Sequence, residues 1–241
     1  MSRSTAPTQS GWRIDSYGDA AIELRCADEI GDAPSARVHA ALGALLAAAL
    51  PEVEDLVPGY VGLTVLLRDL PRPERDRVTL AVKHIVAAAV VSSDAALHRS
   101  VLIPACYGGS SGPDLAAVAA HTGLSEAEVI ARHAAPVYRV AFIGFLPGFP
   151  YLIGLDPMLA MARRATPRTR VPAGSVAIGG AQTGIYPVSS PGGWHLLART
   201  AVRLFDPQHA APSVLCAGDR LRFRPVSLAE LAHATVEIEH A

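Results

Sequence analysis

The sequence predicts an α+β protein in which a small two-layer α/β domain precedes a β-barrel domain. Three observations lead to this fold class. In the first part of the chain, segments whose apolar residues have the spacing of strands alternate with segments that have the spacing of helices. From Val137 onward the apolar residues have the two-residue spacing of strands. The length of 241 residues suits two small domains. Half of the residues are hydrophobic and 18% are charged, so both domains can bury a core. We expect the domains at residues 1–98 and 99–241.

The first domain is expected to alternate strands and helices. Residues 12–26 have the alternation of strands, and a helix with Asp32 as its N-cap follows them. Residues 53–67 predict a second strand region, and residues 73–91 a second helix with one apolar side. Two strand regions and two helices make a two-layer α/β domain.

The second domain begins after a polar stretch at 92–98, which we interpret as a linker. Residues 101–107 predict a strand, and Gly123 is expected to end the short helix that follows it. Ser125 with Glu128, and Ser227 with Glu230, have the spacing of capping boxes at helix starts. Further strands are expected at 138–145, 175–178, 184–187, 195–205 and 220–224. With turn signals between them, they predict a closed or nearly closed antiparallel barrel.

Composition excludes several classes of function. No apolar stretch approaches the ~20 residues that a membrane span needs, and the N-terminus resembles no secretory signal, so we expect a cytoplasmic protein without a membrane partner. A pI of about 6.8 argues against nucleic acid as a partner. Three widely spaced cysteines predict buried thiols and no metal site. Lys83 is the only lysine, which argues against Schiff-base and Walker-type chemistry.

Residues 143–194 are dense in glycine, proline, arginine and aromatic residues, a composition that predicts a binding site built from loops. Between residues 129 and 205 the chain has eight arginines but a single acidic residue, Asp156. This excess of positive charge favours a small anionic ligand. One carboxylate in this region cannot supply the acid pair of a glycosidase, so a self-contained hydrolase is not expected.

Arg168 and Arg170 are candidate catalytic residues. They are two positions apart, so in an extended strand both side chains would face the same way and clamp one phosphate or carboxylate. The alternatives are a solvated basic strand face and pairing with acids of a partner protein, but Pro167, Pro172 and Gly174, which restrain the backbone around the pair, favour the ligand. His133 is a candidate acid or base with a pKa near neutrality, and its alternative is a structural histidine.

The remaining candidates come from the loops. Glycine-rich turns can present backbone N–H groups to an anion, and aromatic residues can line a pocket. Ordinary barrel turns and core packing are the alternatives. The candidate ligand-binding residues are Gln182, Thr183, Gly192, Gly193, Trp194, His195, Phe145, Phe149 and Tyr186.

Long motifs identify a family that the chain resembles. YGGSSGPDL, YRVAFIGFLPGFPYL, TPRTRVPAGSVAIGGAQTGIYP, SSPGGW and AGDRLRF occur in the order and spacing of the KipI family, strongly over residues 101–223. That family includes the B subunit of 5-oxoprolinase and allophanate hydrolase subunit 1. Where its members usually read PRL, this chain has Ala162, Arg163 and Arg164, which adds a charge near the expected site.

The resemblance implies a cyclophilin-like barrel and a protein that is inactive without its partners. The implied function is that of the B subunit of an ATP-dependent 5-oxoprolinase, which opens a lactam to give L-glutamate. The implied partners are KipA or the homologous C subunit of 5-oxoprolinase, together with the A subunit of the complex. ATP with Mg would act in the assembled complex, with no cofactor held tightly by this chain alone. The alternatives are a KipI-like inhibitor of a sensor histidine kinase and the carboxyltransferase half of a urea-carboxylase or allophanate-type enzyme.

Overall fold

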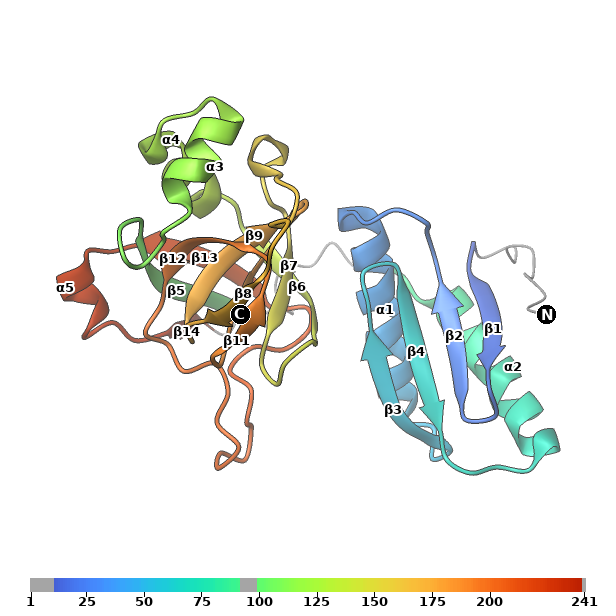
Figure 1. Ribbon diagram of the computed structural model, residues 1–241. Helices are drawn as coiled ribbons and strands as arrows, with labels where there is room; N and C mark the ends of the chain where they lie inside the picture. Colours follow the sequence, from blue (N-terminus) through green and yellow to red (C-terminus); the bar gives the residue numbers. More distant parts are fainter. Residues whose placement is uncertain (1–10, 92–98, 240–241) are drawn as a thin grey trace. The chain divides into compact units, whose positions relative to one another are not determined.

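The computed structural model describes residues 11–91 and 99–239 (Figure 1). The chain divides into two compact units, Met1–Asp94 and Ala95–Ala241, and each is considered by itself. The stretch at 92–98 that the sequence suggests as a linker lies outside the described residues. Cys26, Cys106 and Cys216 are free thiols. The prediction that all three are buried holds only for Cys106, because Cys26 is partly exposed and Cys216 is exposed.

The first unit contains a four-stranded antiparallel sheet in the order β1-β2-β4-β3. Its strands are β1 (Arg13–Tyr17), β2 (Ala21–Arg25), β3 (Val53–Pro58) and β4 (Gly62–Leu67). Each strand region expected from the sequence is therefore a hairpin. Gly18 makes the first turn possible because its φ of 64° suits a residue without a side chain.

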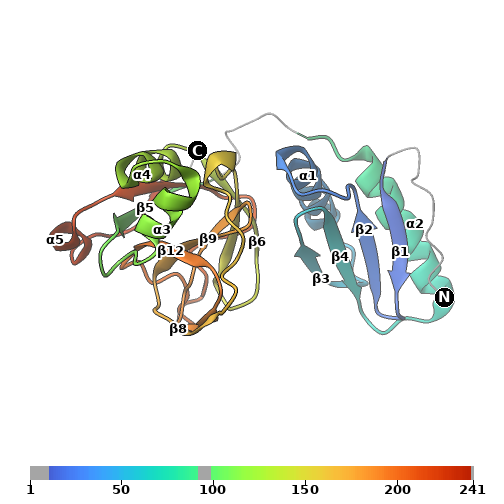
Figure 2. The same ribbon diagram turned by 45° about the horizontal axis from the view of Figure 1, so that its top comes forward.

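Two helices cover one face of this sheet, as Figures 1 and 2 show: α1 (Asp32–Ala48) and α2 (Arg72–Ala88). Their apolar sides, which include Val38 and Val82, pack against Leu63 and Val65 of the sheet. The prediction that Asp32 caps α1 is wrong, because Gly31 is the N-cap. Asp32 lies in the first turn instead, where the helix dipole favours a negative charge.

The second unit is a closed barrel of seven strands in the ring order β12-β9-β10-β7-β6-β13-β5, closed by pairing of β12 with β5. The ring consists of β5 (Ser100–Tyr107), β6 (Tyr138–Ile143), β7 (Pro150–Ile153), β9 (Ser175–Gly179), β10 (Gln182–Ile185), β12 (His195–Arg199) and β13 (Arg220–Pro225). The barrel is not wholly antiparallel, because β5 and β13 run parallel. The strand expected over 195–205 ends at Arg199.

Shorter elements complete this unit. They are α3 (Leu115–Thr122), α4 (Glu126–Ala134), η2 (Pro157–Leu159), β8 (Arg168–Val171), β11 (Ser190–Gly192), α5 (Leu228–Leu231) and β14 (Glu237–Glu239). Strands β8 and β11 pair as a separate ribbon, and β14 adds to β5. Both predicted capping boxes are confirmed, at the starts of α4 and α5. Gly123 ends α3 in the left-handed conformation, as predicted.

The barrel interior is filled by apolar side chains from every wall, among them Ile103, Leu152, Ile178, Leu197 and Phe223. Helices α3 and α4 contact the barrel through β12 and β13 respectively. The barrel is therefore a packed core, so a ligand site must lie on its surface. Among the described helices, none has the length and apolar character needed to cross a bilayer.

Candidate functional site

An aromatic cluster lies where β7, the turn after β10 and the start of β12 meet. The Phe149 ring packs edge-on against Tyr186 and Trp194, with centroid distances of 5.2 and 5.7 Å. Tyr151 completes the cluster, 5.9 Å from the Trp194 ring. Phe149, Tyr186 and Trp194 are buried, together with Val171. The cluster is a small second core beside the barrel interior.

Two glycines let these rings pack directly on backbone. A Cβ at Gly179 would lie 2.6 Å from the Trp194 indole, and a Cβ at Gly192 would lie 2.4 Å from the Tyr186 hydroxyl oxygen. Both distances are below any real contact, so larger residues would displace the rings. The glycine-rich composition that predicted a loop site therefore has a packing cause at these positions.

Phe145 stands at the edge of the cluster on strained backbone. Its φ is 65°, and the Leu146 N–H donates to the Gly144 carbonyl over 2.7 Å, which closes a γ-turn of the rare positive-φ type. The Phe145 side chain is 60% exposed, yet its ring lies 5.5 Å from Phe149. The strained backbone thus holds an exposed aromatic ring in a fixed place. Such strain is typical of functional positions.

A cavity of about 320 Å³, hereafter the aromatic pocket, opens beside this cluster. One wall is aromatic and the other is the basic loop that precedes β8. The lining residues are Phe145, Phe149, Tyr151, Arg163, Arg164, Pro167, Tyr186, Pro191, Gly192, Gly193 and Trp194. The Arg163 guanidinium lies over the Trp194 ring at 5.8 Å, a cation–π distance. The pocket thus combines apolar faces with two adjacent cationic groups.

Asp114 holds the basic loop in place. Its Oδ1 accepts hydrogen bonds from Arg168 over 2.7 Å and from Arg164 over 3.3 Å, and its Oδ2 accepts from the Leu196 N–H over 2.7 Å. Burial raises the pKa of this carboxyl. The Arg168 and Leu196 hydrogen bonds and the charges of Arg168 and Arg164 outweigh burial, so the net pKa is lowered. Asp114 is therefore an ionised anchor.

Sequence reasoning missed Asp114 because it counted acids only between residues 129 and 205. Asp114 is 54 residues from Arg168, and the barrel brings the two together. The available signal was its place in YGGSSGPDL, directly before α3. The loop arginines thus obtain a carboxylate from their own chain, without any partner protein.

Arg168 and Arg170 do not converge on one anion. Arg168 is committed to Asp114, whereas the Arg170 Nε donates to the Ser189 Oγ over 3.2 Å at the surface. The register of β8 against β11 shifts between Arg168, which pairs with Gly192, and Val171, which pairs with Ser190, and this bulge breaks the alternation that a regular strand would have. Neither side chain lines the aromatic pocket, where Arg163 and Arg164 stand instead.

His133 is wholly buried, which argues against the acid–base role that the sequence suggested. Its Nδ1 lies 2.7 Å from the Tyr107 hydroxyl, and its Nε2 lies 3.0 Å from the Thr183 Oγ1. Burial lowers the pKa of His133 to about 3, so the ring is neutral. Thr183 is buried too and donates to the Ala177 carbonyl over 3.0 Å. Both His133 and Thr183 are structural residues, which corrects their assignment to the site.

Two further candidates also lie outside the aromatic pocket. His195 is buried, and its Nε2 lies 2.9 Å from the Ala162 carbonyl, to which it donates. Gln182 begins β10 and does not line the pocket. The candidates that do line it are Phe145, Phe149, Tyr186, Gly192, Gly193 and Trp194. Across residues 11–91 and 99–239, no group of three or more His, Cys, Asp or Glu is placed to hold a metal ion.

Comparison with known proteins gives consistent matches. The profile of the carboxyltransferase domain, subdomains C and D, matches residues 12–215. The B subunit of 5-oxoprolinase from Bacillus subtilis strain 168 is 37% identical over 90% of this chain and 93% of its own length. The B subunit from Escherichia coli O157:H7 is 45% identical over 73% of this chain and 79% of its own length.

Solved structures extend these matches. The crystal structure of TTHA0988 is 38% identical with a TM-score of 0.73, covering 86% of this chain and 40% of that chain. This chain therefore spans less than half of that protein. The urea carboxylase of Kluyveromyces lactis has a TM-score of 0.72 at 17% identity, covering 95% of this chain and 24% of that chain. At that identity the likeness shows a shared fold alone.

Proposed function

Because the chain belongs to the carboxyltransferase domain family, subdomains C and D, we infer that it is the B subunit of an ATP-dependent 5-oxoprolinase. The observation that carries this inference is the identity to the Bacillus relative, which extends over nearly the whole of both chains. The reaction would convert 5-oxoproline, ATP and two waters to L-glutamate, ADP and phosphate. We place it in the cytoplasm, where the C and A subunits would complete the complex.

The aromatic pocket suits the substrate of this reaction. 5-Oxoproline is a small, flat lactam ring that carries one carboxylate. The exposed ring of Phe145 and the partly exposed ring of Tyr151 offer apolar surface to the lactam, and Arg163 and Arg164 offer guanidinium groups to the carboxylate. A volume of about 320 Å³ leaves room for the substrate together with an atom group from another protein of the complex.

The chemical step would depend on the partner proteins. The described residues that line the aromatic pocket include no carboxylate, histidine, cysteine or lysine, and its two tyrosine hydroxyls have pKa values that burial raises. A neutral tyrosine can donate a hydrogen bond but is a poor base near neutral pH. This chain would therefore bind and orient the lactam. The activating groups, ATP and Mg would come together in the assembled complex.

A kinetic experiment on the complex tests this function. Arg164→Gln keeps a polar side chain, although a shorter one, and removes its charge. We expect the KM for 5-oxoproline to rise about tenfold or more in 5-oxoproline-dependent ATP hydrolysis, because a charge-assisted hydrogen bond is worth about 1.5–3 kcal/mol. Arg222→Gln, an exposed arginine on β13, is the matched control and should leave the KM unchanged.

A complete three-protein complex that hydrolyses ATP without any response to 5-oxoproline would refute the function. The shared fold with urea carboxylase favours one alternative, a carboxyltransferase that acts on a urea-like substrate. That alternative requires a biotin carrier in the complex. Turnover with 5-oxoproline in the absence of biotin would exclude it.

A further inference from the structure

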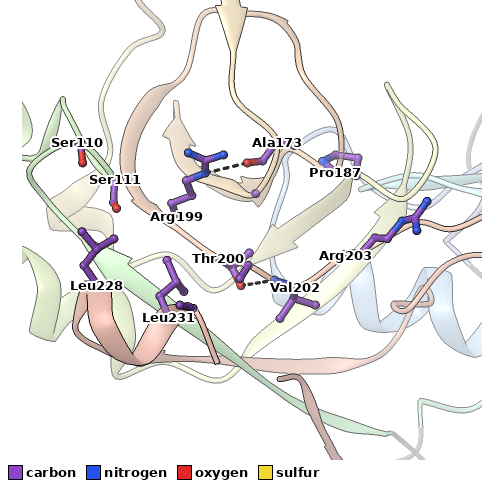
Figure 3. Close-up of a pocket in the computed structure, with 13 residues that line it drawn as sticks. Ser110, Ser111, Ala173, Pro187, Arg199, Thr200, Val202, Arg203, Leu228 and Leu231 are labelled. Atoms are coloured by element: carbon purple, nitrogen blue, oxygen red, sulfur yellow. Dashed lines mark hydrogen bonds between the residues drawn. The ribbon is translucent and has the colours of Figure 1, made fainter. Parts of the chain in front are cut away.

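A second and larger hollow lies elsewhere on the barrel unit and shares no lining residue with the aromatic pocket (Figure 3). Its volume is about 620 Å³. It is formed by the loop after β5, the end of β12 with the segment that follows, and α5. We call this hollow the α5 groove and define it by Ser111, Arg199, Val202, Leu228 and Leu231.

The α5 side of the groove is apolar and rigidly presented. Leu228 is 63% exposed although it is a large apolar residue. Its helix is a single turn, fixed at its start by the reciprocal hydrogen bonds of Ser227 and Glu230. Leu231, in the same turn, is buried and anchors the helix to the rest of the unit. Leu228, Leu231 and Val202 together give the groove an apolar lining beside Arg199 and Arg203, and an apolar hollow with a polar rim is typical of protein–protein contacts.

The opposite side of the groove carries a cation without a counter-charge. The Arg199 Nε donates to the Ala173 carbonyl over 3.1 Å, and its two terminal nitrogens make no hydrogen bond or ion pair to the described residues. Arg203 lines the groove too, but it pairs with Asp206 over 2.9 Å. No acidic side chain is among the described residues that line the groove. Arg199 therefore lacks a counter-charge that the groove itself could supply.

A hydroxyl group borders the groove on the side of Leu228. Ser111 is only 7% exposed, and its side chain makes no hydrogen bond within the described part of the chain. Figure 3 shows Ser110 and Ser111 on the same side of the hollow, above Leu228, with Arg199 across from them. Because the Ser111 Oγ is not one of the buried side-chain atoms that lack a partner, it is open to solvent in the groove, where a docked polar group can hydrogen-bond to it.

We propose that the α5 groove is a docking surface for the C subunit of the complex, and that it takes an apolar segment bearing one acidic side chain. The apolar residues would cover Leu228, and the carboxylate would pair with Arg199 on the other side of the groove. A second copy of this chain fits less well, because a twofold contact through this groove would bring the two unpaired Arg199 groups together. This proposal rests on the proposed function in one respect: it requires the partner protein of the inferred complex.

The test measures assembly rather than turnover. The full chain is mixed with the purified C subunit of the complex, and the dissociation constant is measured by isothermal titration calorimetry. Leu228→Asp and Arg199→Glu should each weaken binding at least about tenfold, because each removes a central contact. Leu80→Asp on α2 and Arg222→Glu on β13 are matched exposed controls and should bind as the wild type does. Circular dichroism confirms that every variant is folded.

A photo-crosslinking amino acid at position 228 identifies the occupant. Crosslinks to an apolar stretch of the C subunit with an Asp or Glu nearby support the proposal. Crosslinks to this chain itself, or wild-type affinity in both groove variants, overturn it, as does the absence of any association. The two proposals can fail separately. If the groove variants weaken assembly but the complete complex does not turn over 5-oxoproline, the docking proposal is supported and the inferred function is refuted.

Discussion

At the level of single residues, Asp114 determines the shape of the basic side of the aromatic pocket. One carboxylate binds two arginines of the loop and one backbone N–H at the start of β12. The Arg164 Nε and the Arg168 Nη1 are nevertheless buried without a hydrogen-bond partner. Because Asp114 is the one acid that these arginines contact among the described residues, losing its charge would release the loop as well as the ion pairs.

Asp114→Asn is expected to reduce stability and substrate affinity together. The arginines are about a quarter to a third exposed, so solvent screens part of the loss, and we expect the free energy of unfolding to fall by about 1–2 kcal/mol. Urea denaturation and the KM for 5-oxoproline measure the two effects. Glu237→Gln, which breaks the exposed pair with Arg224, is the control and should change stability by less than about 0.5 kcal/mol. Equal losses in both variants would contradict the anchoring role.

At the level of elements, the γ-turn at Phe145 sets an exposed ring against the cluster at the expense of backbone strain. Positive φ is unfavourable for any residue with a Cβ, and glycine alone adopts it freely. Alanine usually stabilises a folded chain more than glycine does, and at this turn we expect the opposite.

Phe145→Gly is expected to be more stable than Phe145→Ala by about 1 kcal/mol, because both delete the ring but only glycine relieves the strain. Thermal or urea unfolding of the two variants provides the comparison. Both should bind 5-oxoproline more weakly than the wild type in the assembled enzyme. If alanine is as stable as glycine at this position, the turn stores no strain.

Elements with local signals could be predicted from the sequence, whereas those that depend on distant pairing could not. The capping box at Ser125 and the end of α3 at Gly123 follow from a few adjacent residues. The parallel pairing of β5 with β13 joins segments over 110 residues apart, and nothing local encodes it. The bulge in β8 is likewise invisible in the sequence, and it separated Arg168 from Arg170. The aromatic wall was predictable because its residues cluster in the chain, but its anchor Asp114 was not.

At the level of the whole barrel unit, His133 joins three elements that are far apart in the sequence. It lies on α4 and meets Tyr107 of β5 and Thr183 of β10. The Phe223 ring of β13 packs 4.9 Å from it. A neutral imidazole satisfies both hydrogen-bonding neighbours, so the fold requires this histidine to remain unprotonated.

This requirement makes barrel stability depend on pH. The pKa of His133 is about 3 in the folded chain, against an ordinary value of 6.5, so the unfolded chain binds one more proton between these values. Stability should therefore fall as the pH drops below about 6.5, with a slope of up to about 1.4 kcal/mol per pH unit from this group. The slope is measured from the free energy of unfolding, obtained by urea denaturation monitored by circular dichroism at several values from pH 7 to pH 5. His133→Gln should show a shallower slope, and parallel slopes would mean that another group is responsible.

The distribution of tryptophan offers an experimental opportunity. The sequence contains two, Trp12 in the first unit and Trp194 in the second, and both indoles are nearly inaccessible to solvent. Each has an arginine above its ring, Arg37 at 5.1 Å and Arg163 at 5.8 Å. Intrinsic fluorescence therefore carries one signal from each unit. A Trp12→Phe variant would leave a single emitter at the wall of the aromatic pocket, where a bound lactam would alter its emission without any added label.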